Sequence, residues 1–433
     1  MIENKRNEFP ALFEKRNGKY PIYFDNACMT LKPKPVIDAI LEYYMKFPAC
    51  GGEGRSAHWF SHEINKRIEK SRETIAKFIG AKSEKEIVFI RNTTEGINIV
   101  ANGYPWKKGD KVLTTTKEHN SNLYPWKDLE KKGLIEYYYL PFKGDYTFDL
   151  EGFEKTLKEK GITFVSMGIT SNLDGYTIPF REITKIAHKY GAKVMFDGAQ
   201  YIPHNEIDVT KDDIDFLSFS IHKMCGPSGI GVLYGKYDLL KEIAPFIKGG
   251  GMISDTFLDK DPIYLDPPHR FEAGLQDYAG MIGAGKAAEY LMEIGLKNIA
   301  HYEEGLNTYL DEKLKALPTY GEEFSIIGPS SPEKRSGITT LIFNRSGMVY
   351  LDDGSPKIGI ASLLDAWENI MVRSGEFCVN AWFNFYKISR EREKVRASLY
   401  FYNTKEEVDI FVSSIQKIVS LPEYKMLPKV KEG

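Results

Sequence analysis

The chain has 433 residues, of which 42% are hydrophobic and 27% charged, and its formal net charge is −2 at pH 7. The length exceeds that of one small domain, and the composition is ordinary for a globular enzyme. The small net charge gives no general attraction to nucleic acid or to membranes, and no apolar run reaches membrane-spanning length, so neither is expected as a partner. The first residues are polar and include acids, which is not typical of a signal or transit peptide.

The four cysteines are scattered along the chain, at Cys28, Cys50, Cys225 and Cys378. They form no Cys-x-x-Cys pair and show no spacing typical of zinc ligands. We therefore expect reduced thiols, no metal site and a cytoplasmic location.

Between about residues 84 and 235, strand-like and helix-like stretches alternate. Alternation of this kind favours a mostly parallel sheet with helices on both faces. The strands are predicted at 86–90, 111–115, 135–140, 163–169, 193–196 and 216–220. The helices are predicted from about residue 94 and at 122–132, 150–160 and 180–190.

The pattern changes after about residue 280. Long helices are predicted at 278–294 and 296–317, short strands at 324–327, 338–343, 371–373 and 395–401, and further helices at 360–368 and 405–420. Residues 249–251 predict a flexible turn, and residues 351–357 predict a loop insertion. The sequence thus predicts a large α/β domain of residues 25–280 and a small α+β domain of residues 1–24 and 281–433.

Lys223 follows an apolar strand and precedes a turn rich in Gly and Pro, while Asp197 ends another apolar strand. Because ligands bind beyond the carboxyl ends of parallel strands, both side chains are expected in one site. A lysine that forms a Schiff base and an aspartate that pairs with a pyridinium nitrogen are what pyridoxal phosphate (PLP) requires. The alternative, a surface lysine in a hairpin turn, leaves the matching position of Asp197 unexplained.

Further polar residues near strand ends suit the other groups of PLP. Ser220 and His222 can bind a phosphate, and Thr94 opens a helix whose first amide groups form an anion cradle. Gln200 can reach the phenolic oxygen of the ring. Taken alone, Thr94 is equally typical of an ordinary helix cap.

Three residues carry candidate reaction chemistry. His119 follows a predicted strand and can stack on the pyridine ring and transfer protons, although a lone histidine there is more often structural. Cys378 follows Gly375 in a predicted loop, where it is either an exposed thiol or a buried small hydrophobe. Arg396 lies on a predicted strand and can hold a substrate carboxylate or a structural ion pair.

Several motifs together resemble the class V aminotransferase group of fold-type I PLP enzymes, and within it the group II cysteine desulfurases. They are Arg-Asn-Thr-Thr-Glu-Gly-Ile-Asn (91–98), Glu-His (118–119), Asp-Gly-Ala-Gln (197–200), Ser-Ile-His-Lys (220–223), Arg-Phe-Glu-Ala-Gly (270–274) and Arg-x-Gly-x-x-Cys (373–378). The resemblance covers nearly the whole chain. It implies a mostly parallel seven-stranded sheet sandwiched by helices, with a smaller α+β domain that carries the nucleophile loop.

The resemblance also implies PLP as cofactor, L-cysteine as substrate, a homodimer, and a sulfur-acceptor protein or scaffold as partner. It makes Lys223, His119 and Cys378 catalytic, with a persulfide formed on Cys378 and its sulfur passed on for iron–sulfur cluster or other sulfur-cofactor assembly. The cofactor ligands that it implies are Thr94, His119, Asn172, Asp197, Gln200, Ser220, His222 and Lys223. The substrate ligands that it implies are Ala27, His58, Asn172, Arg373 and Arg396.

The chain departs from the family pattern at a few positions. Glu376 and Phe377 stand where two histidines are usual, and Leu275 stands where a threonine commonly reaches the partner subunit's phosphate. Two alternatives stay open. One is a selenocysteine or cysteine-derivative lyase of the same fold that does not need Cys378, and the other is a PLP-fold scaffold protein with little turnover.

Overall fold

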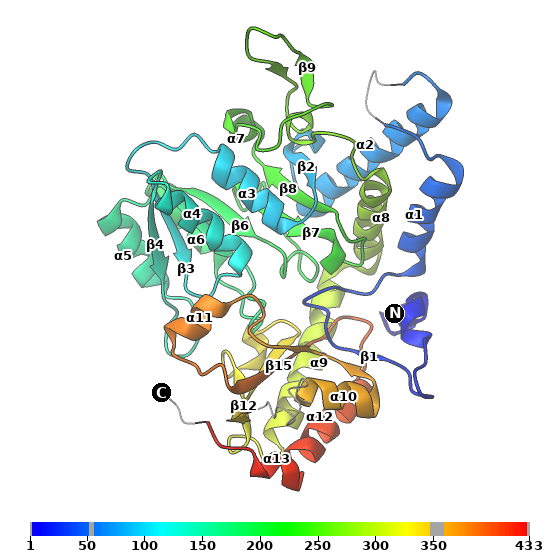
Figure 1. The fold of residues 1–433 in the computed structure, drawn as a ribbon, viewed down its shortest axis with the longest axis vertical. Coiled ribbons are helices and arrows are strands. Elements are labelled where there is room, and N and C mark those ends of the chain that lie inside the picture. Colours follow the sequence, from blue (N-terminus) through cyan, green and yellow to red (C-terminus); the bar gives the residue numbers. More distant parts are fainter. Residues whose placement is uncertain (1, 52–55, 347–358, 431–433) are drawn as a thin grey trace.

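The computed structural model describes residues 2–51, 56–346 and 359–430 (Figure 1). The loop insertion predicted at 351–357 lies outside these residues. Among the helices of the described ranges, none combines the length and the apolar character needed to cross a membrane.

The centre of the molecule is a seven-stranded sheet with strand order β2-β8-β7-β6-β5-β3-β4. Its strands are β2 (Ile87–Ile90), β3 (Lys111–Thr115), β4 (Glu136–Leu140), β5 (Phe164–Gly168), β6 (Lys193–Asp197), β7 (Phe216–Ser220) and β8 (Gly231–Gly235). Only β8 runs antiparallel to its neighbours, so the predicted mostly parallel sheet is confirmed.

Both faces of this sheet are buried, which explains why its central strands are almost continuously apolar. Successive side chains point to opposite faces, so Phe216 joins one hydrophobic cluster and Leu217 joins the other. Helices α3 and α4 supply the first cluster, and α5 and α6 supply the second. These helices are α3 (Thr93–Gly103), α4 (Tyr124–Lys131), α5 (Leu150–Lys160) and α6 (Phe180–Lys189), and the short α7 (Tyr237–Glu242) follows β8.

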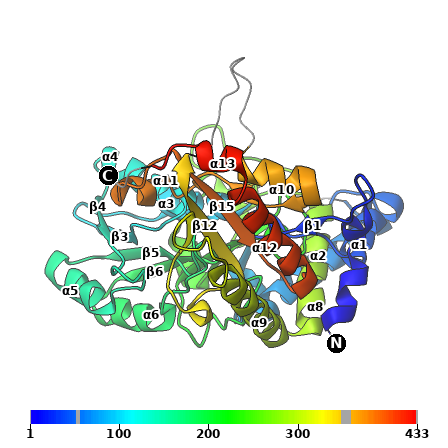
Figure 2. The ribbon, with the colours of Figure 1, turned by 90° about the horizontal axis from the view of Figure 1, so that it is seen from below.

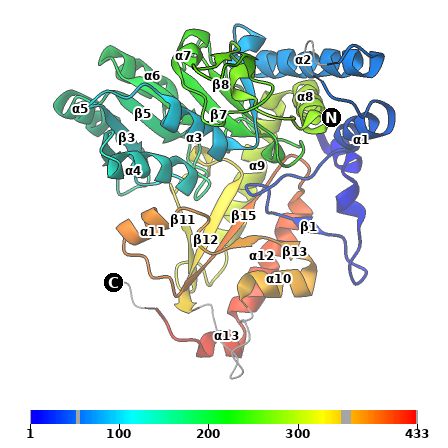
Figure 3. The same ribbon diagram turned by 45° about the horizontal axis from the view of Figure 1, so that its top comes forward.

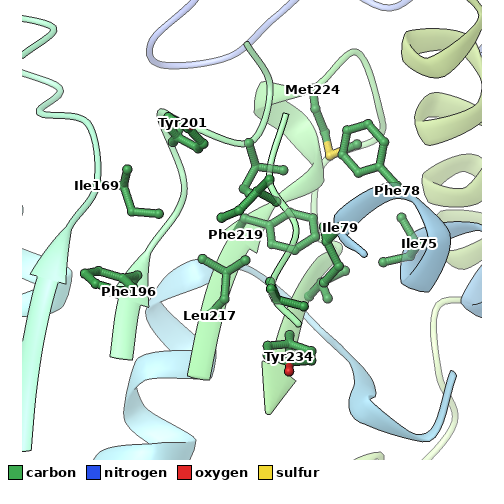
Figure 4. Packing of buried hydrophobic residues seen from close by; sticks show 14 of the residues in the cluster. Ile75, Phe78, Ile79, Ile169, Phe196, Tyr201, Leu217, Phe219, Met224 and Tyr234 are labelled. Carbon is green, nitrogen blue, oxygen red and sulfur yellow. The ribbon is translucent and has the colours of Figure 1, made fainter. Parts of the chain in front are cut away.

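Three long helices pack together on one side of the large sheet (Figure 3). They are α1 (Lys34–Lys46), α2 (Trp59–Ile79) and α8 (Tyr278–Ile294), of which the sequence predicted only α8. Gly285 of α8 lies so close to α2 that a Cβ there would be 2.7 Å from the Ser71 Cα. Figure 4 shows Ile75, Phe78 and Ile79 of α2 against the sheet side chains. The division predicted at residue 280 falls inside α8 and stays a prediction.

The smaller sheet is antiparallel, with strand order β11-β12-β15-β14. Its strands are β11 (Phe324–Ile327), β12 (Ile338–Ser346), β14 (Arg373–Ser374) and β15 (Arg392–Ser398). Helices α9 and α12 lie side by side and cover one of its faces (Figure 2). The helices of this part are α9 (Leu296–Lys315), α10 (Ile360–Glu368), α11 (Asn380–Phe385), α12 (Lys405–Val419) and α13 (Pro422–Met426).

Two strand predictions in this sheet need correction. The strand predicted at 371–373 is split between β13 (Ile370–Met371), which pairs with β1 (Ile22–Tyr23), and β14. The strand predicted at 395–401 begins and ends three residues earlier, as β15. The apolar run continues past Ser398, but the Asn403 side chain accepts a hydrogen bond from the Tyr400 N–H at 2.8 Å and turns the chain. Elsewhere, residues 249–251 lead through a turn into the hairpin of β9 (Ile253–Asp255) and β10 (Ile263–Tyr264).

A buried ion pair fastens α2 to the edge of the large sheet. The Arg72 guanidinium lies 2.7 Å from the Glu272 carboxylate and also donates to the Ile87 carbonyl at 2.8 Å. The Glu272 carboxylate in turn accepts the Phe89 N–H at 2.9 Å. Burial alone would raise the pKa of Glu272, but the charge of Arg72 and the hydrogen bonds from His269 and Arg72 together outweigh burial, and the pKa falls to about 2.

We expect Glu272→Ala to lower the free energy of unfolding by about 3–5 kcal/mol, because it leaves Arg72 charged and buried without its partner. Urea denaturation followed by circular dichroism measures the change. The matched control is Glu159→Ala, which removes an exposed carboxylate 3.9 Å from Lys155 and should change stability little. Equal effects of the two substitutions would contradict the role given to the buried pair.

Candidate active site

A cavity of about 530 Å³ opens at the carboxyl ends of β3, β5, β6 and β7, beneath the smaller sheet. It gathers nearly all of the predicted site residues from distant parts of the chain. Those that line it are Ala27, Thr94, His119, Asn172, Asp197, Gln200, Ser220, His222, Lys223, Arg373, Cys378 and Arg396.

His58 is the predicted site residue that does not line this cavity. It is exposed at the start of α2, where its Nδ1 atom accepts a hydrogen bond from the Ser61 N–H at 3.2 Å. Within this chain, His58 acts as a helix cap, and its contact with substrate stays a prediction.

Lys223 and Asp197 lie at the ends of neighbouring strands and influence each other electrostatically. Burial lowers the pKa of the Lys223 amine, while the charge of Asp197 opposes that shift. Burial raises the pKa of Asp197, against the hydrogen bond from the Ala199 N–H, at 2.9 Å, and the charge of Lys223. A lysine of lowered pKa beside a buried carboxylate matches the pair expected from the sequence.

The turn that carries Lys223 is held by a segment near the N-terminus. Thr30 donates to the His222 carbonyl from both its backbone N–H, at 3.0 Å, and its hydroxyl, at 3.1 Å. The same hydroxyl accepts the Cys225 N–H at 2.8 Å, where Cys225 has a φ of 63°. These contacts hold Cys225 in a left-handed backbone conformation, which residues other than glycine rarely adopt. They therefore also hold the backbone at Lys223 in place.

Hydroxyl groups gather where α3 begins. The Ser220 hydroxyl accepts the Thr93 N–H at 2.9 Å and lies 2.7 Å from the Thr93 hydroxyl. The Thr94 hydroxyl lies 2.7 Å from that of Ser121. Gly231 allows the close approach of α3, because a Cβ there would be 2.8 Å from the Asn92 Cα. A helix N-terminus ringed by hydroxyls is suited to a phosphate.

His119 is neutral in this site. Its Nδ1 atom accepts the Ser121 N–H at 3.2 Å, which leaves the proton on Nε2. Burial and the positive charges of Lys223 and Arg396 lower the pKa of His119 to about 4. Any proton that His119 exchanges near neutral pH would therefore pass through Nε2.

Arg396 is almost fully buried, and its hydrogen-bonding capacity is only partly used. Its guanidinium donates to the Asn172 carbonyl at 3.0 Å and lies 3.4 Å from the Asp25 carboxylate. Its Nε atom has no hydrogen-bond partner in the structure. Burial lowers the pKa of Arg396, with Asp25 opposing the shift. Such a guanidinium is suited to a bidentate carboxylate ligand.

Cys378 is exposed on a tightly turned loop at the mouth of the cavity. Gly375, Phe377 and Cys378 all have positive φ, at 97°, 51° and 60°. Two hydrogen bonds tie the loop to the segments that follow β3 and β5: the Asn120 N–H donates to the Cys378 carbonyl, and the Asn172 amide donates to the Phe377 carbonyl, both at 2.7 Å. The loop is thus held against the cavity, and of the two alternatives that the sequence left open for Cys378, the structure shows the exposed thiol.

The residues that depart from the family pattern anchor this loop. Phe377 packs into a small hydrophobic cluster with Val379 and with Trp382 and Phe383 of α11. The Glu376 carboxylate lies 3.4 Å from the Arg390 side chain and also accepts the Asn380 amide. The negative charge of Glu376 is therefore compensated by Arg390, which follows α11. Leu275, the third departure, is exposed on the surface.

Some residues that line the cavity were not singled out from the sequence. Ser121 follows His119 by two residues, and this spacing could have suggested the contact between the two side chains. Glu118 joins the ends of β3 and β5, because it accepts the Thr115 hydroxyl at 2.6 Å and the Gly168 N–H at 2.9 Å. Burial raises the pKa of Glu118 to about 7. Cys28 gave no sequence signal, because an isolated cysteine in a loop suggests no particular role.

The family model described as aminotransferase class-V matches residues 22–411. The chain belongs to the class-V aminotransferase family. Among similar curated proteins are a probable cysteine desulfurase of Synechocystis, 38% identical over 96% of this chain and 94% of that protein, and a cysteine desulfurase of Serratia proteamaculans, 37% identical over 97% and 98%. Among solved structures, the apo cysteine desulfurase of Thermococcus onnurineus is 36% identical, with a TM-score of 0.84 over 96% of this chain and 98% of that one.

The cavity of this protein fits PLP, the cofactor of the class-V aminotransferase family. Lys223 offers an amine of lowered pKa, and Asp197 offers a buried carboxylate for a ring nitrogen. The buried Gln200 Oε1 atom has no hydrogen-bond partner in the structure, and the hydroxyl groups at α3 suit the phosphate. These residues would hold PLP, with His119 beside its ring.

We expect Lys223 to be the residue that binds PLP covalently. After borohydride reduction and unfolding, mass spectrometry of the wild-type protein should find a pyridoxyl group on the peptide that contains Lys223. Lys223→Ala should lose the attached group, because the other amine that lines the cavity, that of Lys117, is held in an ion pair 2.6 Å from the Asp174 carboxylate. Lys248→Ala, at an exposed lysine, should keep the group. A group retained on the Lys223→Ala protein would contradict the assignment.

We expect His119 of the cofactor-free protein to titrate with a midpoint of about 4, well below its ordinary value of 6.5. Nuclear magnetic resonance of histidine-labelled protein measures the midpoint. Arg396→Gln should raise it, because one of the positive charges that disfavour protonation is removed. Arg16→Gln, at an exposed arginine, is the control, and an unshifted midpoint in Arg396→Gln would count against the electrostatic cause.

Proposed function

We propose that this protein is a PLP-dependent cysteine desulfurase, which converts L-cysteine to L-alanine and holds the sulfur as a persulfide on Cys378. The observation that carries the proposal is the exposed Cys378 thiol, held at the mouth of the same cavity as Lys223 and Arg396. The relatives named cysteine desulfurases, similar along nearly their whole length, support L-cysteine as substrate.

Two arginines are proposed to bind the substrate carboxylate. Arg373 and Arg396 are opposite each other on β14 and β15, so both guanidinium groups reach the cavity from adjacent strands. The contact of Arg396 with Asp25 is 3.4 Å long, and a substrate carboxylate in bidentate geometry can replace it. Ala27 and Asn172 line the same region and would limit the space around the bound amino acid.

Lys223 is proposed to take the proton from the substrate α-carbon. Its pKa is lowered by burial, so the neutral amine that acts as a base is more accessible than in a surface lysine. When bound, PLP supplies an electron sink that makes this proton acidic. Asp197 would keep the ring nitrogen protonated, and His119 would exchange protons through Nε2.

Cys378 is proposed to attack the substrate sulfur. A bond forms between the two sulfur atoms, the bond between the substrate sulfur and its β-carbon breaks, and that carbon gains a proton to give alanine. The sulfur atom remains on the enzyme as a persulfide, which is nucleophilic catalysis with a covalent intermediate. The two hydrogen bonds to the loop carbonyls and the cluster around Phe377 would hold the thiol in position for this attack.

We also propose that the protein acts as a homodimer. Four large apolar side chains are exposed along α1 and the start of α2: Leu41, Tyr44, Met45 and Trp59. An apolar face of this kind favours burial against a second copy. His58 precedes Trp59 at this face, so its predicted substrate contact would be made in the site of the other subunit.

We propose a sulfur-acceptor protein or scaffold in the cytoplasm as the next partner, for iron–sulfur cluster or other sulfur-cofactor assembly. Exposed aromatic rings lie beside the nucleophile loop, with the ring centres of Tyr139 of β4 and Phe385 of α11 5.9 Å apart. Aromatic side chains in such positions are suited to protein recognition.

The test compares alanine formation from L-cysteine, with a reductant present, by the wild-type protein, Cys378→Ser and the control Cys50→Ser. Cys50 lies outside the cavity, so the control should keep its activity. We expect Cys378→Ser to lose at least about 100-fold in rate, because the attacking thiolate is gone. Full activity of Cys378→Ser would indicate a lyase of another kind, and no alanine from the wild type would exclude L-cysteine as substrate.

A further inference from the structure

The cavity contains a second thiol that the proposed reaction does not use. Cys28 lines the cavity together with Cys378, Lys223 and Arg396. It is half-buried, so its sulfur is neither sealed in the core nor free on the surface. The other two cysteines, Cys50 and Cys225, do not line this cavity.

The backbone on either side of Cys28 is firmly held. The Ala27 N–H donates to the Ser398 hydroxyl at 2.9 Å, and the Ala27 carbonyl accepts the Gln200 amide at 2.7 Å. On the other side, the Thr30 hydroxyl donates a hydrogen bond to the His222 carbonyl. The Cys28 N–H itself donates to the Asp25 carbonyl at 3.1 Å. Cys28 is thus placed on the cavity wall by contacts that its neighbours make with β15 and with the segments that carry Gln200 and Lys223.

The two thiols share one electrostatic environment in the cavity. The pKa of Lys223 is lowered by burial, and the thiols of both Cys28 and Cys378 oppose that shift, so both sulfur atoms lie within electrostatic reach of its amine. The Arg396 guanidinium also interacts with Cys28, and its Nε atom has no hydrogen-bond partner among the described residues. The thiolate is the form of a cysteine that attacks sulfur.

The two cysteines differ in how the surrounding backbone holds them in position. Cys378 lies on a loop that two hydrogen bonds hold against the large domain, and three of its residues have positive φ. A persulfide on Cys378 would carry its outer sulfur roughly 2 Å beyond the thiol position, which extends the reach of the loop into the cavity. Cys28, in contrast, is a fixed acceptor on the wall.

We propose that Cys28 is a second sulfur carrier, which accepts the outer sulfur of the Cys378 persulfide. This inference rests on the proposed function, since it requires the persulfide. The Cys28 thiolate attacks the outer sulfur, a new sulfur–sulfur bond forms on Cys28, and the bond to the Cys378 sulfur breaks. The electron pair leaves with Cys378 as a thiolate, and the proton of the Cys28 thiol passes to water. The transferred sulfur keeps its oxidation level, so the step needs no oxidant or reductant.

The consequence is that Cys378 is free to react with another L-cysteine before any acceptor arrives. In the absence of reductant and acceptor, the wild-type holoenzyme should release about two molecules of alanine per subunit in the initial burst. Cys28→Ala should release about one, whereas Cys50→Ala, which removes a thiol outside the cavity, should match the wild type.

The experiment combines this burst with peptide mass spectrometry after alkylation, using L-cysteine that carries labelled sulfur. We expect label on the peptides of both Cys28 and Cys378 in the wild type, on that of Cys378 alone in Cys28→Ala, and on neither in Cys378→Ser. Label on Cys378 alone in the wild type, with a burst of one alanine, would overturn the role of Cys28.

Two further outcomes separate this inference from the proposed function. Label on Cys28 in Cys378→Ser would overturn the transfer step, because Cys28 would then take sulfur without Cys378. Absence of both alanine and label in the wild-type holoenzyme would overturn the proposed function itself. Label on Cys50 to the same extent as on Cys28 would show nonspecific persulfide formation, and would also overturn the role of Cys28.

Discussion

The site depends on one short segment near the N-terminus that joins the large sheet to the smaller sheet at the cavity. Asp25 lies 3.4 Å from the Arg396 guanidinium, and the Ala27 N–H bonds to Ser398, so the segment is fastened to the smaller sheet. Thr30 bonds to the His222 carbonyl and fastens the same segment to the turn of Lys223. These contacts therefore set the distance between the lysine beside the large sheet and the arginine on the smaller sheet. The segment thus makes one cavity from parts of both sheets.

Burial determines the protonation states of the side chains that line this cavity. It lowers the pKa of Lys223 and of His119, and it raises the pKa of Asp197, because each charged form loses contact with water. The nearby charges act on this background: Asp197 supports the Lys223 ammonium, while Lys223 and Arg396 disfavour a charged His119. A base, a carboxylate and a neutral imidazole thus occur side by side, each prepared for a different task.

In the loop of Cys378, the residues that depart from the family pattern have structural roles. Phe377 replaces a polar family residue, and it fills a hydrophobic cluster with Trp382 of α11. The centre of its ring also lies 5.0 Å from the Arg396 guanidinium, which connects the loop to the buried arginine of β15. Glu376 forms an ion pair with Arg390. The departures from the family pattern are consistent with a loop that is anchored by its own side chains.

The sequence by itself determined the alternation of strands and helices, since a sheet buried on both faces requires apolar strands such as Phe216–Ser220. It also indicated the polar residues at strand ends, because Lys223 and Asp197 interrupt apolar runs. It did not predict α1 or α2. Nor could it place Cys28 beside Lys223, 195 residues apart in the chain, because long-range contacts depend on how the domains pack. Only the tertiary structure showed that His58 lies outside the cavity. It also showed that Thr30 and Glu118 hold the walls of the cavity in place, because each of them bonds to a backbone group of a distant segment.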